Sequence, residues 1–188
     1  RSNMNKELLC NAYRTYDRVA VVTEDLIETT GHTGTHMTTY GHDPNIAVVK
    51  NVIDYKKIER MGQEPLTFDE ETISTVSLER LQEILASDAK VLINIGRFSP
   101  EKGHMRLMEQ FARQLEQFQD AYLILLGSRG VLYQETLEAA NRLNVGERII
   151  LIHYLSNPYA LLAQCDGFVF SSFYEGFGLV LAEADILG

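Results

Sequence analysis

The feature that most constrains the fold is a regular alternation of short apolar runs with amphipathic segments, which begins near residue 90 and continues to the end of the chain. The runs are rich in valine, isoleucine and leucine, which is typical of parallel strands covered on both faces. This order predicts an α/β fold, in which a Rossmann-like parallel sheet carries helices on both faces. The strands are expected at residues 91–95, 122–126, 149–152 and 168–170, and the helices at 77–86, 104–118, 132–143, 158–164 and 179–187.

The helix expected at residues 104–118 has the clearest pattern, because Met108, Phe111, Leu115 and Phe118 form one apolar stripe. Residues 1–54 are organised differently, with strands expected at 18–23 and 46–49 around a loop rich in glycine, histidine and threonine. Residues 55–74 have little apolar pattern and are predicted to form a surface connection.

Charge and composition exclude several classes of protein. Seventeen basic residues against 26 acidic ones give a net charge of −9, so a nucleic-acid-binding surface is not expected and an anionic ligand needs a local site. Cys10 and Cys165 lie far apart, which disfavours a disulfide framework and favours a reduced, cytoplasmic protein. No stretch approaches the roughly 20 apolar residues of a membrane helix.

Two strand ends carry the chemistry, because ligands of open α/β sheets lie beyond the carboxyl ends of the strands. The first is the loop 96–103, where Arg97 and Lys102 place two cations between Gly96 and Gly103. Such a loop suits a diphosphate, since arginine offers a planar fork and lysine a point charge. The alternative is a solvated loop with incidental charges. The third strand end, 127–130, gives only a weak signal, because glycine is common in turns.

The second is the loop 171–178, which leads into the helix that holds Glu183. Gly176 and Gly178 leave backbone N–H groups at a helix N-terminus, where phosphate or a sugar oxygen can bind. Glu175 and Glu183 could both accept hydrogen bonds from hydroxyl groups of one extended ligand. The alternative is that one acid stabilises the helix start and the other is merely solvated.

Two motifs carry a resemblance to a known family. Gly-Arg-Phe-Ser-Pro-Glu-Lys-Gly-His at 96–104 and Ser-Phe-Tyr-Glu-Gly-Phe-Gly-Leu-Val-Leu-Ala-Glu-Ala at 172–184 resemble the family 4, or group 1, retaining glycosyltransferases of the GT-B fold. Residues 16–19 and 49–54 resemble that family's acceptor-domain end and interdomain link. The chain departs from the usual pattern at Met105 and at Asp185-Ile186.

The resemblance implies two facing Rossmann-like domains. Residues 1–54 would end the acceptor domain, and 55–188 would form part of the nucleotide-sugar-binding domain, so that this chain alone is expected to be incomplete as an enzyme. Arg97 and Lys102 would hold the diphosphate, Glu175 the transferred sugar and Glu183 the ribose. The other implied donor-binding residues are Gly96, Gly176, Phe177, Gly178 and Leu179, and the implied catalytic residues are Glu175, Arg97 and Lys102.

The resemblance also implies the partners: a nucleotide-sugar donor, a glycan, lipid or polymer acceptor, and the facing N-terminal domain, at the inner face of a membrane in the full-length protein. No Asp-x-Asp triplet occurs, so neither a metal nor another cofactor is expected. His32 and His36 are disfavoured as metal ligands, since no third ligand lies near them in the sequence. Tyr154 could line a base pocket, whereas Asn157 is better placed to cap the helix that starts near Pro158.

Two rival functions remain open. One is a nucleotide-sugar epimerase on the same two-domain fold, which the Glu175 to Glu183 spacing disfavours. The other is a non-catalytic nucleotide-binding or docking module, which would be complete without a facing acceptor domain. A flavodoxin-like receiver domain is disfavoured because cations replace its acidic cluster.

Overall fold

The computed structural model describes residues 19–21, 46–128, 130–175 and 178–188. The chain divides into two compact units, Arg1–Ile53 and Asp54–Gly188, which we describe separately. In the first unit, strands β1 (Val19–Val21) and β2 (Ile46–Val48) pair in parallel. Both strands fall within expected ranges. The expected loop with His32 and His36, and Cys10, lie outside the described residues.

The second unit is built on a five-stranded sheet with the order β3-β6-β5-β4-β7. Strands β4, β5, β6 and β7 run parallel to one another, and β3 pairs antiparallel with β6 at one edge. The predicted α/β class with a Rossmann-like sheet is therefore confirmed. The strands are β3 (Ile73–Ser74), β4 (Lys90–Ile95), β5 (Ala121–Gly127), β6 (Ile149–His153) and β7 (Gly167–Phe168).

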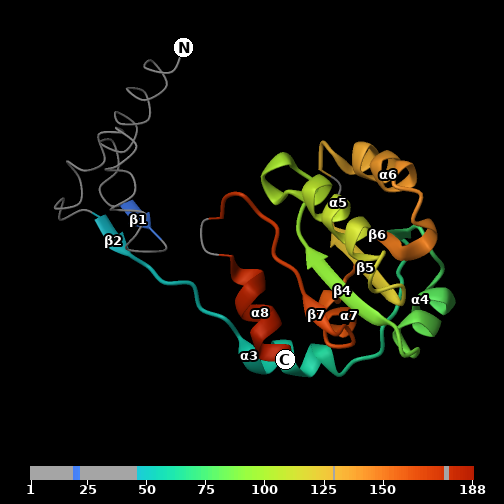
Figure 1. Ribbon diagram of the computed structural model, residues 1–188. Coiled ribbons are helices and arrows are strands. Elements are labelled where there is room, and N and C mark those ends of the chain that lie inside the picture. The colour runs from blue at the N-terminus through green and yellow to red at the C-terminus, as the bar shows by residue number, and fades with distance from the viewer. Residues whose placement is uncertain (1–18, 22–45, 129, 176–177) are drawn as a thin grey trace, which may run out of the picture. The chain divides into compact units, whose positions relative to one another are not determined.

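Helices cover the sheet on both faces (Figure 1), as near-continuous apolar strands require. On one face, Met108 and Phe111 of α5 pack with Leu123 and Leu125 of β5. On the other face, the strands pack against α4 and α7, and α8 packs against α3 and α7. The helices are α3 (Tyr55–Gly62), α4 (Leu78–Leu85), α5 (His104–Gln114), α6 (Tyr133–Arg142), α7 (Pro158–Leu162) and α8 (Leu179–Leu187), with 3-10 turns η2 (Pro100–Lys102) and η3 (Gly146–Arg148).

Side-chain caps fix the starts of three helices. Ser77 accepts a hydrogen bond from the Arg80 N–H at the start of α4, and Asp54 caps α3 in the same way. Asn157 accepts from the Ala160 N–H at the start of α7, which confirms the expected cap. Asn157 also donates to the Met61 carbonyl oxygen, and this bond ties α7 to the end of α3.

Two predictions about local structure were wrong. Residues 55–74 are not only a surface connection, because they contain α3 and the edge strand β3. Ile58 of α3 is buried, although the other residues of this helix are exposed or half-buried. The helix expected to reach residue 118 ends at Gln114, because the chain must turn before β5 begins at Ala121. Phe118 therefore lies outside the helix and is 63% exposed.

Candidate functional site

The loops after β4 and β7 lie together, because the two strands are parallel neighbours in the sheet. The backbone N–H of Phe173 donates to the Glu101 carbonyl oxygen at 2.7 Å, and Ser171 Oγ donates to the Lys102 carbonyl oxygen at 2.7 Å. The two loops singled out from the sequence therefore form one site, although about 70 residues separate them along the chain.

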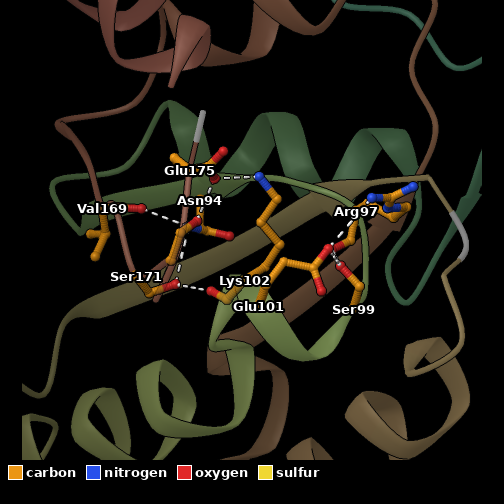
Figure 2. A network of polar contacts seen from close by, with 9 residues as sticks. Asn94, Arg97, Ser99, Glu101, Lys102, Val169, Ser171 and Glu175 are labelled. Atoms are coloured by element: carbon orange, nitrogen blue, oxygen red, sulfur yellow. Dashed lines mark hydrogen bonds and ion pairs between the residues drawn. The ribbon is translucent and has the colours of Figure 1, made fainter. Parts of the chain in front are cut away.

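Lys102 and Glu175 form an ion pair across the two loops (Figure 2). Their side chains are only 20% and 24% exposed, and Ser172 Oγ donates a second hydrogen bond, of 2.7 Å, to Glu175 Oε1. Partial burial raises the pKa of Glu175, but the hydrogen bonds from Lys102 and Ser172 outweigh it and hold the pKa below its ordinary value. The carboxyl group is therefore an ionised acceptor at neutral pH.

Arg97 lies on the same loop but is held less firmly. Its guanidinium group pairs with Glu101 at 3.4 Å, and the Arg97 side chain is 65% exposed. Glu101 also accepts from Ser99 Oγ at 2.6 Å, and this bond, together with the Glu101 N–H and Arg97, lowers the pKa of the Glu101 carboxyl. Each expected cation thus has a carboxylate partner, so a diphosphate that enters must share or displace these carboxylates.

Asn94 fixes the end of β4 against the end of β7. Its Nδ2 donates to the Val169 carbonyl oxygen at 2.7 Å and makes a longer contact of 3.4 Å with Ser171 Oγ, while its buried Oδ1 has no hydrogen-bond partner among the described residues. Asn94 is not among the site residues predicted from the sequence. The available signal was a single polar side chain within the apolar run 91–95.

Two glycines with positive φ determine the course of the backbone at the site. Gly103 has φ 69°, and a Cβ there would collide with the Ser171 carbonyl oxygen of the facing loop. Gly178, with φ 67°, precedes α8, whose N-terminus has no side-chain cap. A helix start of this kind can present its first N–H groups to a ligand oxygen, and Leu179, the first helical residue, is 41% exposed.

Glu183 does not join the Lys102–Glu175 pair. Tyr159 Oη of α7 donates to Glu183 Oε1 at 3.0 Å. Burial, followed by this carboxylate, raises the pKa of Tyr159 to about 12, so the phenol stays protonated. The expected ribose contact of Glu183 would have to compete with Tyr159 and stays a prediction. Gly96 follows β4 and donates its N–H to the Leu126 carbonyl oxygen at 2.9 Å, and Gly176 and Phe177 lie outside the described residues.

His104, which follows Gly103, lies buried beneath the site. Its ring is 4.9 Å from that of Phe98, and neither ring nitrogen has a hydrogen-bond partner among the described residues. Burial, followed by the positive charge of Lys102, lowers the pKa of His104 to about 4. The imidazole is therefore neutral at physiological pH.

We expect His104 to make the fold sensitive to acid. Below pH 6.5 the imidazole of His104 takes up a proton in the unfolded chain, whereas in the folded chain it stays neutral until about pH 4. The folded state therefore loses stability as the pH falls through this range. The loss should reach on the order of 3 kcal/mol. Urea unfolding of the wild type and of His104→Leu, at neutral pH and at about pH 4.5, measures this loss in the free energy of unfolding. An unchanged difference between the two pH values in the variant would contradict this role.

Within the part of the chain that the structure describes, no three His, Cys, Asp or Glu side chains are grouped so that they could hold a metal ion. Over the same residues, no helix is long and apolar enough to cross a bilayer.

Comparison with known proteins identifies relatives of this chain. Residues 77–188 match the family model described as "Glycosyl transferases group 1". An uncharacterized glycosyltransferase of Methanocaldococcus jannaschii is 33% identical over 137 residues, which cover 73% of this chain and 30% of the relative. The N-acetylgalactosamine-N,N'-diacetylbacillosaminyl-diphospho-undecaprenol 4-alpha-N-acetylgalactosaminyltransferase of Campylobacter jejuni is 34% identical over 112 residues, which cover 60% of this chain and 29% of the relative.

A solved structure has the same architecture. An Anabaena protein in complex with UDP and glucose superposes with a TM-score of 0.68 at 18% identity, over 98% of this chain and 46% of that one. At this identity the likeness shows the fold alone. The chain spans less than a third of the length of the two curated relatives.

Proposed function

This chain belongs to the group 1 glycosyl transferases, and from that we propose that it supplies the donor-binding part of a retaining, family 4 glycosyltransferase. The observation that carries the proposal is the Lys102–Glu175 pair at the carboxyl edge of the sheet. A cation for a leaving phosphate and a carboxylate for sugar hydroxyls lie side by side there, and α8, whose start has no side-chain cap, begins four residues after Glu175 in the sequence.

We propose that Arg97 and Lys102 hold the diphosphate and that Glu175 holds the transferred sugar. As the glycosidic bond breaks, positive charge builds up on the sugar and negative charge on the departing phosphate. Lys102, Arg97 and the backbone N–H groups at the start of α8 would stabilise the phosphate. Lys102 is held in place by its pair with Glu175 across the two loops, and we propose that no metal ion is needed. Gly96, Gly176, Phe177, Gly178 and Leu179 would line the donor, and Glu183 would bind the ribose after releasing Tyr159.

The donor we propose is a nucleoside diphosphate sugar, with UDP as the first nucleotide to test, because the Anabaena protein was solved with UDP and glucose. The acceptor we propose is a glycan, lipid or polymer hydroxyl, contacted from a facing N-terminal domain. The name of the C. jejuni relative describes an undecaprenol-linked acceptor, which supports a lipid acceptor here, and we propose a cytoplasmic protein that works at the inner face of a membrane. That name also describes an α linkage, which an α-linked donor gives only with retention.

Slow hydrolysis of the donor tests the chemistry without an acceptor. The whole protein is incubated with UDP-glucose, GDP-mannose, ADP-glucose or CDP-glucose, in magnesium and in EDTA, and proton NMR records the sugar anomer released first. We expect one base to be preferred, equal rates with and without magnesium, and release of the anomer that the donor carries. Release of the opposite anomer would exclude retention, and loss of hydrolysis in EDTA would contradict the metal-independent site.

A further inference from the structure

We infer that Arg106 of α5 is a positioning residue that clamps the loop Ser171–Glu175 and so sets where Glu175 meets the transferred sugar. This inference rests on the proposed function for its meaning, but not for all of its tests. Arg106 belongs to neither motif in the sequence, and its side chain is not part of the Lys102–Glu175 pair.

Arg106 makes two contacts with the loop through one guanidinium group. Its Nη2 donates to the Ser171 carbonyl oxygen at 2.9 Å, and the guanidinium carbon lies 4.3 Å from the centroid of the Phe173 ring. One planar group therefore holds the first and the third residue of the loop at the same time. Lysine carries the same charge but cannot donate and stack with one rigid plane.

The clamp joins the loop to a rigid element. Arg106 lies in the first turn of α5, and Met108 and Phe111 anchor that helix in the core at 1% and 6% exposure. The other contacts of this loop, from Phe173 N–H to Glu101 and from Ser171 Oγ to Lys102, reach the loop 96–103, and a longer contact of 3.4 Å joins Ser171 Oγ to Asn94 of strand β4. Among these contacts, the hydrogen bond and the stack from Arg106 connect the loop that carries Glu175 to an α-helix.

Burial alone does not account for the position of the Phe173 ring. This ring is 52% exposed, so burial does not fix it, yet the guanidinium group lies over its face. Arg106 is itself exposed, and both side chains can therefore be truncated with little effect on the core.

The expected effect is on the sugar and not on the nucleotide. Arg106→Ala should leave the affinity for UDP within about twofold, because Arg97 and Lys102 stay in place, and should lower the affinity for UDP-glucose by roughly tenfold. Phe173→Ala should act in the same direction. The double variant should be little worse than Arg106→Ala alone, since both changes break one contact. Arg113→Ala, which removes a charge from the exposed side of the same helix, is the matched control and should change neither affinity.

Calorimetry with UDP and UDP-glucose, and with GDP and GDP-mannose in parallel, measures these affinities in the whole protein. An equal loss for nucleotide and nucleotide sugar in Arg106→Ala would make Arg106 a diphosphate ligand and overturn the inference. Additive losses in the double variant would overturn it too, because they would mean that the two residues act separately.

A readout without any ligand separates this inference from the proposed function. Phe173→Ala changes no charge, but a displaced loop should move Glu175 away from Lys102, so the pKa of Glu175 should rise toward its ordinary value. Carbon-13 NMR titration of the Glu175 carboxyl measures this. A rise in a protein that binds none of the nucleotides supports the clamp and rejects the proposed function. An unchanged pKa of Glu175 in both Phe173→Ala and Arg106→Ala overturns the clamp, whatever the protein binds.

Discussion

Lys102→Ala in the whole protein is expected to lower kcat for sugar transfer or donor hydrolysis by about 10² to 10³. Lys102 donates to Glu175 across the two loops and is the less exposed of the two cations, so its charge acts where water screens it least. The variant loses the cation at the departing phosphate and leaves Glu175 as an unpaired carboxylate where the diphosphate must bind. Both changes oppose the transition state.

A matched lysine provides the control. Lys90 stands at the opposite end of β4 and pairs with Asp166 at 2.7 Å, so Lys90→Ala breaks a similar ion pair far from the carboxyl edge. We expect Lys90→Ala to keep kcat within about twofold, because exposed ion pairs contribute little. Rate measurements over a range of donor concentrations give kcat and KM for both variants. Near-normal kcat in Lys102→Ala, or equal losses in the two variants, would contradict the catalytic role of Lys102.

Gly103→Ala is expected to destabilise the fold by about 3 kcal/mol and to weaken donor binding with it. Two effects add together at this position. A φ of 69° strains any residue with a Cβ, and the new methyl group would collide with the Ser171 carbonyl oxygen. The collision pushes the facing loop, and Glu175 with it, away from Lys102.

Gly146→Ala separates the two effects. Gly146 has φ 62°, but a Cβ there would meet nothing within 4 Å, so only the backbone strain applies. Its expected cost is about 1 kcal/mol. Urea unfolding gives both free energies, and calorimetry with a nucleotide sugar shows which variant loses binding. Equal destabilisation by the two substitutions, with donor binding intact, would mean that the close approach of Gly103 to Ser171 does not shape the site.

The sequence predicts the sheet well because β4, β5 and β6 are buried on both faces and so have nearly continuous apolar runs. The sequence does not predict α3, where Ile58 is the one buried residue, or β3, a two-residue edge strand with an exposed isoleucine. Neither element has enough apolar residues to show a period. Packing against α7 and α8, and pairing with β6, determine them instead.

Sequence reasoning finds the two loops of the site but not the contacts between them. Strand order shows that the loops meet, yet the pairing of Lys102 with Glu175 depends on Gly103 and on hydrogen bonds between distant residues. Glu101 lies in the first motif, but the sequence does not indicate that it pairs with Arg97. Arg106 looks like an ordinary exposed helical cation, because its partners lie 65 and 67 positions further along the chain. Glu183 is expected at the ribose, and the sequence gives no sign that Tyr159 would donate a hydrogen bond to it.

Calorimetric titration of UDP, GDP, ADP and CDP into the protein and into its Arg97→Ala/Lys102→Ala double variant shows whether the diphosphate binds at the carboxyl edge of β4. We expect one nucleotide to bind selectively, with and without magnesium, and the double variant to lose at least about tenfold in affinity for it. Equal affinity of both proteins for that nucleotide would mean that the diphosphate lies somewhere other than at the carboxyl edge of β4.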